Sequence, residues 1–280
     1  MKKYSITSRQ INAFRCALEN EERSELTVKK YLRDVRKFQV FIDGAYFDKQ
    51  SVIEYKQELE QRFKVSSANS MLAALNRMFE FCGWSELRVR AIKVQKSLYS
   101  EPERELSRDE YSRLLQAARQ SNNERLGLVM QAICSTGIRV SELRYFTVES
   151  LKRGKTEVVG KGKRRMVFFT RQLSKRLLAY AKQEDIASGP IFLSSRGNPL
   201  NRHSIWADMK SLCNDAGVAP QKVFPHNLRH LFARTFYALE KDLLRLADIL
   251  GHSSVNTTRI YTAECGATHI RLLERLPLLC

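Results

Sequence analysis

The segment LTVKKYLRDVRKFQVFI, residues 26–42, repeats apolar side chains three and four positions apart along its whole length. This spacing gathers them on one face of an α-helix, so the segment predicts an amphipathic helix. The same pattern recurs in residues 8–20, in residues 67–82 and, more weakly, in residues 51–62. Gly83 directly follows residues 67–82 and is typical of a helix C-terminus. The first ninety residues therefore predict a unit of four helices.

Basic residues follow the outer face of the predicted helix at residues 26–42. They are Lys29, Lys30, Arg33, Arg36 and Lys37. A solvated helix face and a surface that contacts DNA phosphates fit this pattern equally well. We take Lys29, Lys30, Arg33 and Arg36 as candidate DNA contacts.

A linker and a second unit follow the four helices. Residues 91–106 lack periodicity and carry mixed charge, which indicates an extended connection. Ser107 and Glu110 then form a capping-box pattern, which predicts that a new helix begins there. We therefore predict one domain at residues 1–90 and a second at residues 107–280.

The segment TEVVGKGKRRMVFFT, residues 156–170, is the clearest strand signal in the chain. Two β-rich runs, residues 157–159 and 165–170, flank a Gly-Lys-Gly-Lys loop, which predicts a β-hairpin. We expect the helices of this domain at residues 107–119, 124–135, 140–146, 171–184, 202–215, 226–239, 242–250, 255–262 and 267–275. The expected fold class is mainly α with a small β-sheet in the second domain.

The charge balance points to a polyanionic partner. The 48 Lys and Arg residues against 30 Asp and Glu give a net charge of +18, spread over both halves. Nucleic acid is the commonest partner of such a charge, although a merely basic protein has the same composition. No stretch approaches the roughly 20 apolar residues that span a bilayer, and the start lacks a signal-peptide core. We therefore expect a cytoplasmic protein with no membrane partner.

The six cysteines show no spacing typical of metal ligands. We expect reduced, mostly buried thiols of an intracellular protein. No acidic metal site, P-loop or zinc motif appears, so we expect no metal and no cofactor.

Two arginine motifs carry residue types that suit a phosphate, because a guanidinium fork matches two phosphate oxygens and stays charged. Arg139 follows Gly137, which should end a helix, and so falls at a helix junction. His226 and Arg229 lie three positions apart at a helix start and share one face. Each motif alone is weak, since a capped helix with an exposed arginine also explains the second. We expect His230 to point to another side and to be structural.

A histidine and a tyrosine further along the chain are also candidate site residues. His252 follows Gly251, which should end another helix, and Tyr261 lies nine residues further along. A phenol can attack a phosphodiester, but a tyrosine in an apolar helix is more often a core residue.

The series TGIRVSEL, GKGKRR, HNLRH, LGHSS and TTRIYT resembles the tyrosine recombinase family, also called the phage integrase family. In the front half, residues 26–42 and 66–84 look like the core-binding domain of that family. The resemblance implies a SAM-like four-helix core-binding domain and an α+β catalytic domain that together clamp DNA in a C shape. Leu231 stands where the family often has Ser or Thr, at a position that is not catalytic.

The resemblance also implies the covalent step. Tyr261 would attack the scissile phosphate and form a 3′-phosphotyrosine, which releases a 5′ hydroxyl. Lys161 matches the family lysine that protonates the leaving 5′ oxygen, with Lys163 as the alternative.

The remaining family positions are filled by the expected residue types. Arg139 and Arg229 would hold the non-bridging oxygens, His226 would act in proton transfer, and His252 would hydrogen-bond the phosphate. Glu142 matches an acidic position that is usually structural.

The resemblance implies a minimal, Xer-like recombinase for DNA integration, excision or resolution, since the core-binding pattern starts by residue 8. Its partners would be double-stranded DNA with inverted-repeat core sites and further copies in a homotetramer, or a paralogue in a hetero-oligomer. Residues 267–279 would dock on a neighbouring protomer or pack on their own domain. A type IB topoisomerase and a non-catalytic DNA-binding regulator are the alternatives. The core-binding helices argue against the first, and the complete set of catalytic residue types argues against the second.

Overall fold

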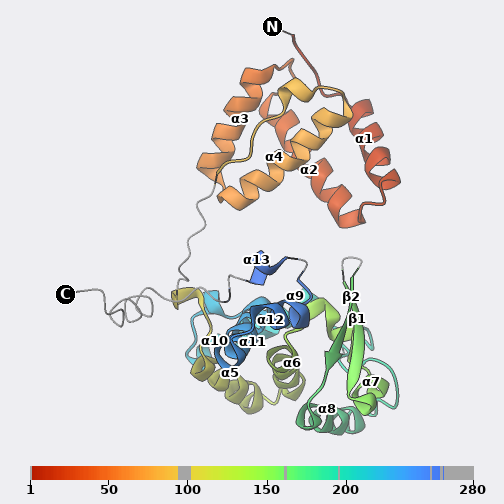
Figure 1. The fold of residues 1–280 in the computed structure, drawn as a ribbon, viewed down its shortest axis with the longest axis vertical. Coiled ribbons are helices and arrows are strands. Elements are labelled where there is room, and N and C mark those ends of the chain that lie inside the picture. Colours follow the sequence, from red (N-terminus) through yellow and green to blue (C-terminus); the bar gives the residue numbers. More distant parts are fainter. Residues whose placement is uncertain are drawn as a thin grey trace, which may run out of the picture. The chain divides into compact units, whose positions relative to one another are not determined.

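The computed structural model describes residues 2–93, 102–160, 163–194, 196–252, 254–258 and 261. The chain divides into two compact units, residues 1–96 and 97–280 (Figure 1). Each unit has its own buried core. Within the described ranges, no helix combines the length and the apolar character needed to cross a bilayer.

The first unit consists of helices that enclose an aromatic core. They are α1 (Ser8–Asn20), α2 (Glu25–Phe41), α3 (Lys49–Arg62) and α4 (Val65–Phe81), followed by a 3₁₀ helix (Ser85–Leu87). α4 packs against both α2 and α3 (Figure 1). Phe38 of α2 is fully buried and makes edge-on contacts with the rings of Phe47, Tyr55 and Phe79. The predicted four-helix unit is confirmed.

A buried carboxylate organises the basic face of α2. Asp34 accepts hydrogen bonds from Lys30 Nζ at 2.8 Å and from Arg33 Nε and Nη2 at 3.1 and 3.0 Å. Lys30 Nζ also donates to the Ser70 carbonyl of α4 at 3.2 Å. Because a buried charge is costly unless it is paired, Lys30 and Arg33 both stabilise Asp34, and Lys30 also links α2 to α4.

The second unit combines helices with one antiparallel pair of strands (Figure 1). The helices are α5 (Arg108–Gln120), α6 (Glu124–Thr136), α7 (Val148–Arg153), α8 (Arg171–Gln183), α9 (Arg202–Ser211), α10 (Cys213–Ala216), α11 (Pro225–Glu240), α12 (Leu243–Leu250) and α13 (Val255–Thr258). 3₁₀ helices span Pro102–Arg104, Val140–Tyr145 and Pro220–Lys222. α6 is the central helix, since it packs against α5, α8, α9 and α11. The mainly α fold with a small β-sheet is as predicted.

The sheet is the predicted hairpin of β1 (Lys155–Gly160) and β2 (Lys163–Phe168). Lys155 pairs with Phe168 and Gly160 pairs with Lys163, so residues 161 and 162 alone connect the strands. Both connecting residues lie outside the described ranges, and with them the predicted acid Lys161.

Several local predictions differ from the structure. The helix predicted at residues 202–215 is interrupted at Leu212, where α9 ends and α10 begins. α7 was not predicted, because six residues are too few to show a helical period. α13 covers the start of the helix predicted at residues 255–262, and the helix predicted at residues 267–275 lies outside the described ranges. The four described cysteines are free thiols, but Cys16 is exposed and only Cys213 is fully buried, which corrects the prediction of mostly buried thiols.

Candidate active site

The loop after α6 brings Arg139 close to the start of α11. α6 ends at Gly137, whose φ of +64° lies in the left-handed region. A Cβ at this position would collide with the ring of Phe232 in α11, so both the backbone conformation and the close approach require glycine. The approach allows the Gly137 carbonyl to accept a hydrogen bond from Arg229 Nη1 at 2.6 Å.

Arg229, on the first turns of α11, is fully buried and links the ends of two other helices. Its Nη2 donates to the Leu250 carbonyl at the end of α12 at 2.8 Å, while its Nη1 reaches the end of α6. Nη2 also faces His252 Nε2 at 3.0 Å. Its Nε is buried and has no hydrogen-bond partner among the described residues. The N–H on Nε therefore remains for an incoming ligand.

Arg229 stays charged at neutral pH although it is buried. Burial and, after it, the Arg139 guanidinium lower its pKa to about 10, while the nearby Tyr261 opposes the change. A fully buried cation without a carboxylate partner is costly, so an anion beside it would be strongly stabilised.

A buried carboxylate holds Arg139 in place. Glu142 accepts from the Arg139 backbone N–H at 2.8 Å and from Arg139 Nη1 at 3.1 Å. Both terminal nitrogens of Arg165 in β2 also donate to Glu142, each at 2.8 Å. Burial opposes the charge on Glu142, but the hydrogen bonds from Arg165 and from the Arg139 backbone keep its pKa below the usual range. The structural role predicted for Glu142 fits these contacts.

Arg165 is a site residue that the sequence reasoning missed. Its Nε donates to the Ile249 carbonyl of α12 at 3.0 Å, so the side chain links the hairpin, Glu142 and the turn that carries His252. A Cβ at Gly251 would crowd the Arg165 side chain, which shows how closely this turn and β2 approach. The only sequence signal was its place in GKGKRR, among three adjacent basic residues.

The contacts of His252 define its tautomer. Arg229 Nη2 can only donate, so Nε2 of the neutral ring accepts from it. Nδ1 then carries the hydrogen and donates to Thr258 Oγ1 at 2.9 Å. Burial and the charges of Arg229 and Arg139 lower the pKa of His252 to about 4, so the imidazole is neutral at pH 7.

Three rings join α11 to Tyr261. His226 and His230 lie one turn apart with ring centroids 4.7 Å apart, and the His230 ring lies 4.8 Å from that of Tyr261. The prediction that His230 points to another side is therefore wrong, because a spacing of four residues keeps both histidines on nearly the same helix face. Burial, followed by the charges of Arg229 and Arg139, lowers the pKa of His226.

A cavity of about 400 Å³ opens where these elements meet. Arg139, His226 and Arg229 line it, together with Arg202 and Trp206 of α9, which the sequence reasoning did not select. Three guanidinium groups around one cavity create a positive potential that favours an anion. Among the described residues, no group of three or more His, Cys, Asp or Glu is arranged to hold a metal ion.

The remaining predicted residues lie away from this cavity or outside the described ranges. Lys29, Arg33 and Arg36 are exposed on α2 of the first unit, and Lys30 is half-buried there. The backbone of Lys163 begins β2, and the position of Lys161 is not described. The structure thus brings together Arg139, His226, Arg229, His252 and Tyr261.

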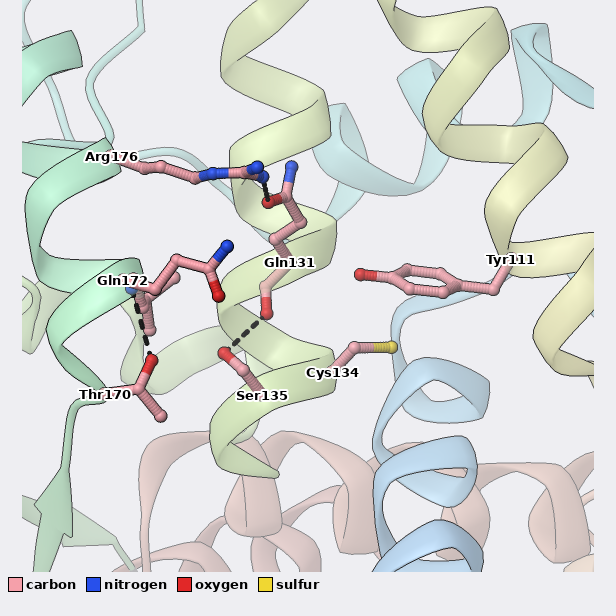
Figure 2. Close-up of a pocket in the computed structure, with 8 residues that line it drawn as sticks. Tyr111, Gln131, Cys134, Ser135, Thr170, Gln172 and Arg176 are labelled. Atoms are coloured by element: carbon pink, nitrogen blue, oxygen red, sulfur yellow. Dashed lines mark hydrogen bonds between the residues drawn. The ribbon is translucent and has the colours of Figure 1, made fainter.

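A second cavity, of about 240 Å³, lies between α5, α6 and α8 (Figure 2). Arg176 of α8 donates to the side chain of Gln131 at 2.6 Å at one end, and Tyr111 faces Cys134 at the other. The thiol of Cys134 donates to the Leu228 carbonyl of α11 at 3.4 Å. None of the predicted site residues lines this cavity, so it is separate from the candidate active site.

Two family descriptions match the chain. Residues 104–266 match the phage integrase family, and residues 11–86 match the N-terminal SAM-like domain of phage integrases. These two matches cover both compact units.

Individual relatives agree with the family matches. Tyrosine recombinase XerD of Vibrio cholerae serotype O1 is 31% identical over 261 residues, which cover 85% of this chain and 86% of the relative. Tyrosine recombinase XerA of Pyrococcus furiosus is 28% identical over 290 residues, covering 100% and 98%. A crystal structure of a lambda integrase (75–356) dimer bound to a COC′ core site superposes with a TM-score of 0.74 over 91% of this chain and 94% of that one, at 18% identity.

Proposed function

Because the chain belongs to the phage integrase family, we propose that it is a site-specific recombinase that cuts and rejoins DNA through a 3′-phosphotyrosine at Tyr261. The observation that carries the proposal is a cavity lined by Arg139, His226 and Arg229. His252 bonds Arg229 beside it, and the Tyr261 ring lies next to that of His252. The relatives that match over most of the chain are named tyrosine recombinases and are enzymes.

The proposed reaction is a transesterification. The phenol oxygen of Tyr261 attacks the phosphorus while His226 accepts the phenol proton, the bond to the 5′ oxygen breaks, and Lys161 gives a proton to that leaving oxygen. The phosphotyrosine keeps a phosphodiester of similar energy, so the reverse attack by a 5′ hydroxyl of the partner strand rejoins the DNA. No step needs ATP or a metal ion.

The arginines supply the electrostatic part. Negative charge increases on the non-bridging oxygens as the phosphorus becomes five-coordinate, and fixed cations that match this geometry lower the barrier. Arg229 is fixed by two backbone carbonyls and Arg139 by Glu142, so neither must reorganise during the reaction. A phosphate would also partner the free Nε of Arg229.

A bound phosphate would change the histidines. Arginine charges hold down the pKa of both His226 and His252. An anion in the cavity offsets those charges and raises both pKa values, which makes each neutral ring a stronger base.

The substrate and assembly follow from the same proposal. We expect double-stranded DNA with inverted-repeat core sites, a homotetramer or a hetero-oligomer with a paralogue on synapsed duplexes, and a cytoplasmic location. Related structures include a lambda integrase tetramer bound to a Holliday junction. Lys29, Lys30, Arg33 and Arg36 would meet phosphates in the first unit. The proposed docking helix within residues 267–279 lies outside the described ranges.

The test uses a pool of nicked duplexes with randomised inverted arms, because the DNA site is unknown. Complexes that survive detergent are isolated, and their DNA is sequenced. We expect a selected site and an adduct that disappears in Tyr261→Phe but persists in Tyr46→Phe, whose ring is 73% exposed in the first unit. Selective binding without any adduct would instead support a DNA-binding regulator. Relaxation of supercoiled plasmid without strand exchange would support a topoisomerase.

A further inference from the structure

The ring of His230 contacts the proposed nucleophile and has no task in the mechanism above. It meets the Tyr261 ring edge-on, at a centroid distance of 4.8 Å and an interplanar angle of 76°. It meets His226 in the same manner on α11, at 4.7 Å and 75°. Edge-to-face contacts of this kind fix the relative orientation of two rings.

A second ring supports Tyr261. The His252 ring lies 6.0 Å from it and nearly parallel, at 16°. His252 is fixed in turn by Arg229 and Thr258, and Tyr261 is 4% exposed. The phenol ring therefore lies next to two imidazoles whose own positions are set by α11 and by the turn after α12.

His230 performs this role as an uncharged ring. Burial lowers its pKa to about 4, and the groups that face it, His226, Arg234, Arg229 and His252, all act in the same direction. Arg234 is itself paired with Glu105 and the Leu106 carbonyl, so it stays in place. A neutral imidazole can pack on a phenol without adding another cation to a pocket that already holds several.

We propose that His230 is a positioning residue for the reaction, and that its ring sets the orientation of Tyr261 for in-line attack on the phosphate. This inference rests on the proposed function. His230 acts through ring contact and exchanges no proton with the substrate or the phenol. Side chains that hold a reacting group within a fraction of an ångström matter, because a displacement of about 1 Å can cost about 100-fold in rate.

The first experiment measures the rate of adduct formation on the selected nicked duplex. We expect His230→Ala and His230→Gln to slow the adduct by about 10- to 100-fold with unchanged DNA affinity. His230→Phe, which restores a ring, should lie within about 5-fold of wild type, and its pH profile should be parallel to that of wild type. His203→Ala, at an exposed histidine of α9, is the control.

Two outcomes overturn the proposal. One is an unchanged rate in both His230→Ala and His230→Gln. The other is a fast glutamine variant with a slow phenylalanine variant, because this result assigns His230 a hydrogen-bonding or proton-transfer role. Thermal melting of each variant separates these results from misfolding.

A second experiment needs no DNA and therefore distinguishes failure of this inference from failure of the proposed function. Tetranitromethane nitrates accessible tyrosines, and peptide mass spectrometry reports the rate at Tyr261. We expect faster nitration of Tyr261 in His230→Ala and a rate near wild type in His230→Phe. Equal rates in all three proteins would show that His230 does not hold the ring, whether or not the protein recombines DNA.

Discussion

Replacing Glu142 by glutamine should destabilise the second unit by about 3 kcal/mol. The carboxylate is 2% exposed and accepts the backbone N–H of Arg139 and three guanidinium N–H groups of Arg139 and Arg165. Removing one partner of a buried ion pair costs about 3–5 kcal/mol. The Arg139 side chain is 36% exposed and can be hydrated, so its pair with Glu142 contributes at most about 1 kcal/mol to the expected loss of stability. The buried Arg165 carries the rest.

The assay is urea unfolding at pH 7.5, followed on the transition of the second unit. Glu157→Gln is the control, since Glu157 makes only an exposed 3.7 Å pair with Arg164, and it should cost less than about 0.5 kcal/mol. Adding Arg165→Met to Glu142→Gln should recover part of the loss, because the variant then buries no unpaired cation.

The stabilisation by Glu142 should depend on pH in a defined direction. The folded-state pKa of Glu142 is lowered, so its stabilising contribution is complete above the unfolded pKa of about 4.3 and is lost as the pH falls through the folded value. The stability difference between wild type and Glu142→Gln should be constant above about pH 5 and shrink below about pH 4. A loss under about 1 kcal/mol at pH 7.5, or a difference that does not shrink as the pH falls below about 4, would refute the reasoning.

Three further predictions follow from the geometry around α6 and α11. Gly137→Ala should lower the free energy of unfolding by more than about 3 kcal/mol, because the alanine would have a positive φ and would also collide with Phe232. The control Gly154→Ala, at a positive φ in open space, should lower it by about 1–2 kcal/mol. Similar losses in both variants would contradict the close approach of α6 and α11. Arg229→Lys should slow adduct formation by at least about 100-fold and should also lower the melting temperature, because an ammonium cannot bond the ends of both α6 and α12. A variant that melts at the wild-type temperature would disprove the link between the two helix ends. Cys134, whose pKa burial raises to about 12, should react with a disulfide reagent at pH 8 far more slowly than the exposed Cys16, and equal rates in the native protein would contradict its burial.

Periodicity and turn chemistry made much of the fold predictable. The helix at residues 26–42 was visible because its buried face repeats over four turns, and α2 occupies Glu25–Phe41. The hairpin was visible because a short loop between β-rich runs fixes the register. α7 was not visible, because Thr147 and Ser150 cap a helix too short to repeat.

Motifs located the candidate site, but they could not show how its parts are supported. Arg139, His226 and Arg229 stand beside helix ends, where local sequence signals are strong. Arg165 was hidden among 48 basic residues, since nothing local marks a side chain whose partner lies 23 positions earlier. The contact between His230 and Tyr261 depends on how α11 meets a segment 31 residues later, which no short window contains.

The two carbonyls that hold Arg229 have a consequence for reading related sequences. On the proposed function, a descendant that had abandoned strand cleavage could replace Tyr261 by phenylalanine and keep its buried ring. It would still need a guanidinium at position 229 to tie the ends of α6 and α12 together. An arginine at this position in a distant homologue therefore indicates that the fold is intact. On the proposed function, the hydroxyl at position 261 is the better indicator of catalytic activity.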